Sequence, residues 1–249
     1  QAESEHVAWS FDAPKLALTI NHLVVDGVSW RIILEDMESA YHGRPLPAKT
    51  TSYVDWAHRI AAHDFSADLA YWESAAETDG SLPTDRQGTP TTSETITVRL
   101  DPETTDALLR KVPEAYRTQA NDVLLSALGR ALAEWTGRNE VLVGLEGHGR
   151  EDIVDGVDLS RTVGWFTAEY PVALDIPAGD WGETLKAVKE QLRAVPSKGL
   201  GYGALRHLHG TAPEIRPGSA STTTASGATT RAASTGRSPA ATRKAPAPT

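Results

Sequence analysis

The sequence of 249 residues contains no cysteine. Disulfide bonds and thiolate metal sites are therefore excluded, which fits a reducing compartment and predicts a cytoplasmic location. No apolar run approaches the roughly 20 residues that a helix needs to cross a bilayer, so we expect no membrane partner. No secretory signal is visible and the sequence opens at Gln1, so we expect a piece of a longer protein.

Basic residues are scarce as well, with 24 Lys and Arg against 33 Asp and Glu, a formal net charge of −9. A nucleic-acid partner needs a basic face that neutralises phosphates, so this balance argues against nucleic acid as a partner and favours solubility. Residues 211–249 differ in composition, because they are rich in Thr, Ala, Ser, Pro and Gly and contain no aromatic residue. This composition predicts a disordered low-complexity tail.

Strand and helix signals alternate along the remaining sequence, which predicts the α/β class. Alternation at residues 96–100 predicts a strand, and apolar spacing at 121–136 predicts the clearest helix. Residues 141–145 are apolar except for one glycine, as in a strand that is covered on both faces.

His22 follows a predicted strand at residues 16–20, and the strand's alternation would place it on the apolar face. Ser29 is a candidate cap for the next helix. A histidine fixed in direction is suited to general acid–base catalysis. The alternative is a core histidine satisfied by a backbone group. Metal ligation is less favoured, because no third ligand has suitable spacing, and we expect no metal site.

Glu146 comes directly after the strand predicted at 141–145. A carboxyl group at the end of a buried strand is a candidate for proton transfer. The alternative is a strand-end glutamate that reaches solvent. Gly147 and Gly149 flank His148, which predicts a tight backbone path beside a ligand.

Several segments resemble those of a known family. Residues 21–30, Asn-His-Leu-Val-Val-Asp-Gly-Val-Ser-Trp, are similar to the His-His-x-x-x-Asp-Gly motif of the condensation-domain superfamily, which includes chloramphenicol acetyltransferase-like acyltransferases. Residues 146–152, 161–171 and 199–203 resemble segments typical of epimerization domains within that superfamily, and residues 121–129 match a helix motif between them. The chain therefore resembles an epimerization domain of a nonribosomal peptide synthetase.

The resemblance implies an α/β fold of two chloramphenicol acetyltransferase-like lobes, present only in part. Residues 1–50 would form the C-terminal part of the first lobe and residues 51–210 most of the second. The family's opening and closing segments have no counterpart here, so we expect a chain that is truncated at both ends.

The implied activity is a cofactor-free epimerization, from L to D, of the α-carbon of an aminoacyl or peptidyl thioester. The thioester would be carried on the phosphopantetheine of an upstream peptidyl carrier domain, and a downstream condensation domain is a further implied partner. His22 and Glu146 would form the acid–base pair, facing each other across the α-carbon.

Supporting roles are implied for Asn21, Asp26, Gly27 and Arg150. Asn21 stands where the family has its first motif histidine, and it can keep a hydrogen bond but carries no charge. Asp26 is expected to hold the motif turn through an ion pair with Arg150 across the lobes. The alternative is that Asp26 merely caps the following helix.

A substrate tunnel is expected to be lined by His148, Trp165, Tyr170 and Tyr202. The alternative for His148 is a hydrogen bond to the backbone, and aromatic residues on a strand belong more often to the core. Two other functions stay open: a condensation domain that forms peptide bonds through His22, and an inactive remnant that at most docks a carrier protein. The segments that begin at Glu146 and contain Trp165 disfavour condensation.

Overall fold

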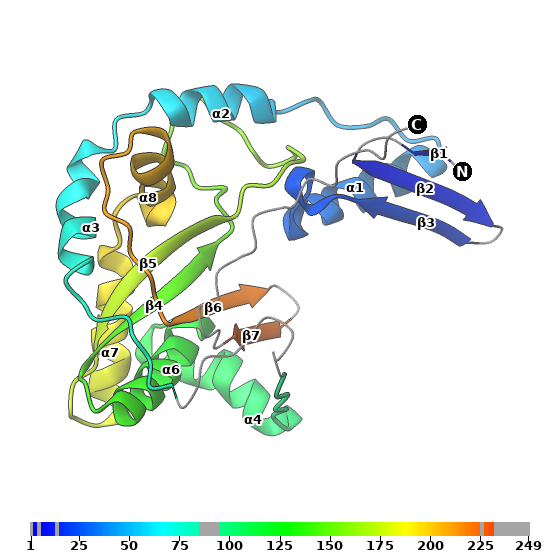
Figure 1. Cartoon of the computed structure of the whole chain (residues 1–249). Coiled ribbons are helices and arrows are strands. Elements are labelled where there is room, and N and C mark those ends of the chain that lie inside the picture. Colours follow the sequence, from blue (N-terminus) through cyan, green and yellow to red (C-terminus); the bar gives the residue numbers. More distant parts are fainter. Residues whose placement is uncertain (1, 4–5, 13–14, 85–94, 225–226, 232–249) are drawn as a thin grey trace, which may run out of the picture.

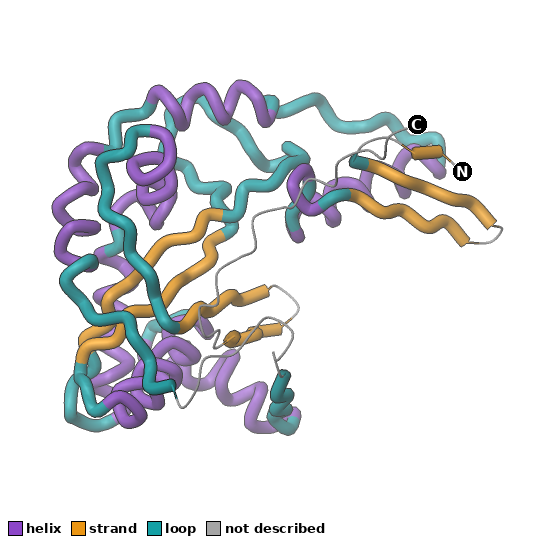
Figure 2. The backbone as a smooth tube through the Cα atoms, viewed as in Figure 1, coloured by secondary structure: helices purple, strands orange, loops and turns teal. Residues whose placement is uncertain are grey.

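The computed structural model of the chain describes residues 2–3, 6–12, 15–84, 95–224 and 227–231. Their strands form a three-stranded sheet and a four-stranded sheet, which lie apart in Figure 1. Several helices lie around the four-stranded sheet, and one long helix lies beside the three-stranded sheet (Figure 2). The mixture of helices and strands confirms the predicted α/β class.

The three-stranded sheet is antiparallel, in the order β1-β2-β3. Its strands are β1 (Ala2–Glu3), β2 (Val7–Asp12) and β3 (Lys15–Ile20). The strand predicted at 16–20 is confirmed within β3. His22 does not continue the apolar face of β3, because it begins a 3₁₀ turn (His22–Val24) and its side chain is exposed.

Helix α1 (Gly27–Tyr41) follows that turn. Its cap is Asp26, whose extended backbone lets the carboxylate accept a hydrogen bond from the Ser29 amide at 2.7 Å. The prediction that Ser29 is the cap was therefore wrong. Ser29 lies inside the first turn of α1 and is fully buried.

The four-stranded sheet has the order β5-β4-β6-β7. Its strands are β4 (Glu140–Gly147), β5 (Ala168–Asp175), β6 (Ser219–Thr224) and β7 (Gly227–Arg231). β4 pairs antiparallel with β5 and parallel with β6. The strand predicted at 141–145 is confirmed, since Val141, Leu142, Val143 and Leu145 are all buried.

Helices α6 (Ala120–Thr136) and α7 (Trp181–Ala194) pack against the four-stranded sheet (Figure 1). The helix predicted at 121–136 is confirmed by α6. The other described helical segments are α2 (Tyr53–Ala62), α3 (Leu69–Ala75), α4 (Pro102–Asp106), α5 (Val112–Tyr116), α8 (Leu200–Gly203), 3₁₀ turns at Ser66–Asp68 and Pro196–Gly199, and π turns at Ala107–Lys111 and Ala204–Leu208.

The main hydrophobic core lies between this sheet and its helices. Val143, Val172 and Leu174 of the sheet are fully buried with Leu125 of α6 and Val188 of α7. Burying each such side chain contributes roughly 1.5–3 kcal/mol. This core holds β4 and β5 in place, and with them the residues at their ends.

Two predicted segments differ in the structure. Residues 96–100 form no strand and their apolar side chains are exposed, because no neighbouring strand pairs with them among the described residues. Disorder was predicted for residues 211–249, yet this range contains β6 and β7. A parallel ladder with β4 orders β6 through backbone hydrogen bonds, which do not require apolar side chains. Residues 232–249 lie outside the described part.

Candidate functional site

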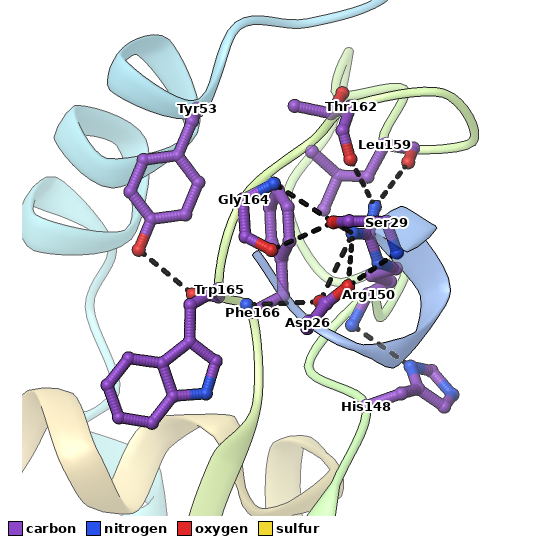
Figure 3. Close-up of polar contacts among 10 residues, drawn as sticks. All are labelled: Asp26, Ser29, Tyr53, His148, Arg150, Leu159, Thr162, Gly164, Trp165 and Phe166. Carbon is purple, nitrogen blue, oxygen red and sulfur yellow. Dashed lines mark hydrogen bonds and ion pairs between the residues drawn. The ribbon is translucent and has the colours of Figure 1, made fainter. Parts of the chain in front are cut away.

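One polar cluster joins the start of α1 to the loop between β4 and β5. It consists of Asp26 and Ser29 from α1 and of Arg150, Gly164 and Phe166 from the loop, and we call it the Asp26–Arg150 cluster (Figure 3). Asp26 and Arg150 are 124 residues apart in the sequence. The cluster therefore depends on the tertiary fold rather than on local sequence.

Arg150 is the centre of the cluster. Its Nη2 donates to both carboxylate oxygens of Asp26 at 3.1 Å and to the Ser29 hydroxyl at 2.9 Å. Its Nη1 donates to the carbonyls of Leu159 at 2.9 Å and Thr162 at 2.7 Å. The side chains of Arg150 and Asp26 are only 8% and 5% exposed. The planar guanidinium therefore fixes the loop and α1 at the same time.

Asp26 performs both roles that the sequence left open, because it caps α1 and pairs with Arg150. Its Oδ2 also accepts a hydrogen bond from the Phe166 amide at 3.3 Å. Burial alone would raise the pKa of Asp26, but the hydrogen bond from the Ser29 amide and the charge and hydrogen bonds of Arg150 lower it below its ordinary value. The carboxylate is thus held ionised as part of the scaffold.

The Ser29 hydroxyl is fully saturated with hydrogen bonds. It donates to the Gly164 carbonyl at 2.9 Å and accepts from the Gly164 amide at 3.0 Å and from Arg150. A hydroxyl has one donor and two acceptor sites, so no capacity is left. Nothing in the local sequence indicates this role, since a serine near a helix start is usually a cap.

The loop's path depends on a glycine. Gly149 has φ +65°, and a Cβ atom there would lie 1.6 Å from the Phe166 carbonyl oxygen. The Phe166 ring lies 4.0 Å from the Arg150 guanidinium carbon, a cation–π contact. The tight backbone path predicted around His148 is therefore present, although it approaches the loop itself rather than a ligand.

His22 lies beside the loop residue Trp165, with ring centroids 5.9 Å apart in an edge arrangement. Asn21 supports the turn, because its side chain accepts a hydrogen bond from the Leu23 amide at 3.0 Å. The Tyr53 hydroxyl donates to the Trp165 carbonyl at 2.9 Å and so fixes the loop from α2 (Figure 3). The exposed ring of His22 thus extends from a capped turn and lies beside an anchored loop.

His148 makes local contacts. Its Nδ1 accepts a hydrogen bond from the Arg150 amide at 3.0 Å, and its Nε2 lies 3.3 Å from a carboxylate oxygen of Glu151. Because Nδ1 is an acceptor, the proton of the neutral ring must be on Nε2. The expectation that His148 lines a tunnel has no support in these contacts.

Glu146 lies near the end of β4 and is exposed. It lines an open pocket of about 230 Å³, together with two residues that were predicted for the tunnel, Tyr170 and Tyr202. The side chain of Glu146 lies on the face of β4 opposite to that of Val143 and Leu145, because side chains alternate along a strand. Burial raises the pKa of Tyr170, with a further contribution from Glu151, so its hydroxyl stays protonated.

Tyr202 forms one side of this pocket by holding the segment that leads to β6. Its hydroxyl donates to the Pro213 carbonyl and accepts from the Ile215 amide, both at 3.2 Å. Gly199, in the same motif, has φ +82°, and a Cβ atom there would meet the ring of Tyr170 at 2.1 Å. Gly199 thus lets the chain pass close to Tyr170 in the wall of the pocket.

The structure groups the predicted residues into three places. Asp26 and Arg150 form the cluster, His22 contacts Trp165, and Glu146 shares its pocket with the two tyrosines. His22 and Trp165 do not line that pocket. Among the described residues, no group of three or more His, Asp or Glu side chains could hold a metal ion. No described helix combines the length and apolar character that spanning a membrane requires.

Residues 7–214 match the family model described as "Condensation domain". Tyrocidine synthase 1 of Brevibacillus parabrevis is 43% identical over 220 residues, which cover 81% of this chain and 20% of that protein. The crystal structure of the epimerization domain from the third module of tyrocidine synthetase B is 41% identical, with a TM-score of 0.73, over 83% of this chain and 52% of that one.

The first condensation domain of the calcium-dependent antibiotic synthetase is 24% identical, with a TM-score of 0.59, over 83% of this chain and 47% of that one. This likeness bears on the fold alone. The chain spans a small part of the curated relative and about half of the solved domains. The family match covers most of the chain, so the chain belongs to the condensation-domain family of nonribosomal peptide synthetases, as its motifs indicated.

Proposed function

We propose that this member of the condensation-domain family epimerises the α-carbon of an aminoacyl or peptidyl thioester carried by a neighbouring carrier domain. The observation that carries the proposal is the likeness to a solved epimerization domain, at 41% identity over 83% of the chain. The solved condensation domain is 24% identical. Residues 1–50 are assigned to a first lobe and residues 51–210 to a second, which meet at the Asp26–Arg150 cluster.

The reaction needs no redox step. A base removes the α-proton, the electron pair of the C–H bond is delocalised into the thioester carbonyl as an enolate, and a proton returns to the opposite face. Glu146 in its open pocket and His22 beside Trp165 are assigned as the two proton-transferring groups. Each positioned transfer contributes roughly 10²–10⁴-fold to the rate.

The Asp26–Arg150 cluster is assigned a positioning role. Asp26 and Arg150 are both buried and bound to each other and to neighbouring protein groups, so neither is available to a substrate. The cluster instead fixes the turn that carries His22 relative to the loop that leads into β5. Its contribution to the rate comes through geometry.

The test uses the full chain with a carrier protein loaded with an L-aminoacyl pantetheine thioester in D₂O. We expect deuterium at the α-carbon and formation of the D isomer, both reduced about 10²-fold or more in Glu146→Gln and in His22→Ala. Glu140→Gln and His207→Ala are matched controls, because both residues are exposed and neither lines the pocket. Amide formation with a second loaded carrier would instead identify condensation, and neither reaction would indicate a remnant.

A further inference from the structure

An aromatic neighbour orients the imidazole of His22. This residue begins the 3₁₀ turn after β3, and its side chain is exposed. Among the described residues the imidazole has no hydrogen-bond or ion-pair partner, and its ring contact is with Trp165, at an interplanar angle of 61°. Edge contacts between aromatic rings favour a defined geometry. The direction of the His22 ring therefore depends on where the ring of Trp165 is held.

The backbone around Trp165 is anchored from two helices. The residues on either side of it belong to the Asp26–Arg150 cluster and are hydrogen-bonded to side chains of that cluster at the start of α1. The carbonyl of Trp165 itself accepts the hydrogen bond from the Tyr53 hydroxyl of α2, at 2.9 Å (Figure 3). Three consecutive residues of the loop are thus held by side chains from distant parts of the sequence.

The donor of this hydrogen bond is held in place as well. The ring of Tyr53 lies 5.1 Å from that of Phe166 and 5.4 Å from that of Trp56, and a side chain at Gly164 would overlap it. Burial and the charge of Asp26 raise the pKa of Tyr53, so its hydroxyl stays protonated and able to donate. The phenol is therefore a rigid donor that points at the loop.

Packing does not require the hydroxyl of Tyr53. The side chain is 37% exposed, so water is an available partner for a hydroxyl there. A phenylalanine at this position would keep the ring contacts with Phe166 and Trp56 and would lose only the hydrogen bond to Trp165. The part that the hydroxyl plays can therefore be measured separately from the packing of the ring.

We propose that Tyr53 is a positioning residue for proton transfer, because it holds the carbonyl of Trp165 and the ring of Trp165 in turn orients the imidazole of His22. The inference rests on the proposed role of His22. A proton is transferred only over a short distance, about 2.6–3.2 Å between the heavy atoms. A displacement of about 1 Å can lower the rate about 10²-fold. The second lobe thereby orients a proton-transferring group of the first.

The first test follows exchange of the α-proton in D₂O, with the full chain and a carrier protein loaded with an L-aminoacyl pantetheine thioester. Tyr53→Phe should lower kcat about tenfold and change KM less than about twofold, because the hydroxyl acts through geometry rather than through substrate binding. Tyr41→Phe is the matched control, since Tyr41 also contacts a histidine ring, that of His42, but is 87% exposed. It should leave both constants unchanged.

The ring of Trp165 is tested in the same assay. Trp165→Leu should lower kcat at least as much as Tyr53→Phe, and Trp165→Phe should restore part of it, because phenylalanine keeps an aromatic edge beside His22. Trp135→Leu is the control, since Trp135 is 55% exposed and lies in α6.

A double variant separates positioning from a general structural effect. In a chain that carries His22→Ala, neither Tyr53→Phe nor Trp165→Leu should lower the residual exchange further, because both act through His22. Equal factors with and without His22, or a Tyr53→Phe chain as fast as the unaltered one, would overturn the proposal.

A second test needs no catalysis. In the unaltered chain we expect a nuclear Overhauser contact between the ring protons of His22 and Trp165, with His22→Ala assigning the signal. The contact should weaken in Tyr53→Phe and persist in Tyr41→Phe. Its absence from the unaltered chain, or its full strength in Tyr53→Phe, overturns the positioning role. A contact that depends on Tyr53 in a chain that exchanges no α-proton supports the positioning of His22 and overturns the epimerase function.

Discussion

Replacing Arg150 with methionine tests the Asp26–Arg150 cluster most directly. Methionine keeps much of the side-chain volume but removes the charge and every donor. Asp26 then remains buried without its cation, and Ser29 and the carbonyls of Leu159 and Thr162 lose a partner. The remaining hydrogen bonds to Asp26 come from the Ser29 and Phe166 amides.

The expected loss is large because the pair is buried. Removing one partner of a buried ion pair costs about 3–5 kcal/mol, since it leaves an uncompensated charge. Arg161→Met is a matched control from the same loop to the same helix. Arg161 is 25% exposed and pairs with Glu35 and Asp36, which are 62% and 36% exposed, so we expect a loss of at most about 1 kcal/mol.

The pH dependence gives a second, independent prediction. In the unaltered chain the pKa of Asp26 is lowered, so its stabilising contribution is present above the unfolded carboxyl pKa of about 3.9 and is lost as pH falls through the folded pKa. Without Arg150, burial is the largest remaining influence and acts to raise that pKa. The difference in stability between the two chains should therefore be largest near pH 7 and shrink towards pH 4.

The assay is urea unfolding of the unaltered chain and both arginine variants, followed by fluorescence at several pH values. A double variant with Asp26→Asn and Arg150→Met should recover part of the stability lost in Arg150→Met, because no buried charge is then left unpaired. The reasoning fails if Arg150→Met loses no more than Arg161→Met, or if its deficit does not depend on pH.

Other predictions follow from local geometry. Gly149→Ala should lower the free energy of unfolding by about 3 kcal/mol or more, because the added methyl group would clash with the Phe166 carbonyl. Gly43→Ala is the control, since Gly43 has a similar φ of +66° but lies in open space, and it should cost only about 1–2 kcal/mol. Equal losses of the two variants in urea unfolding would contradict this prediction. Tyr202→Phe removes two hydrogen bonds and should destabilise by about 1–3 kcal/mol, with faster amide exchange at Ile215; unchanged exchange would show that Tyr202 does not hold this segment.

Much of the hydrophobic core around the four-stranded sheet could be predicted from the sequence. The stripe of α6 and the apolar run of β4 are local patterns, and their periods follow from helix and strand geometry. The strand at 96–100 was predicted wrongly from the same kind of local pattern that correctly predicted the strands within β3 and β4. Alternation describes one strand, but a strand also needs a neighbour, which a local pattern cannot supply.

In the candidate site, too, local motifs could be predicted from the sequence, whereas contacts between distant segments could not. Asp26 and Arg150 were recognised from motifs, and the sequence also offered helix capping for Asp26, which is the other role it performs. Ser29 was assigned to the wrong task, because its contacts with Gly164 lie 135 residues away.

The sequence by itself determined the family and the helices and strands with clear periodicity, and it proposed which residues transfer protons. The tertiary structure decided which of them meet. The register of β4 with β5 placed Glu169 opposite Glu146, and the fold brought Arg150 to Asp26 across 124 residues of sequence. Register is a relation between distant segments, fixed by packing and backbone hydrogen bonds, and so it cannot be read from either segment alone.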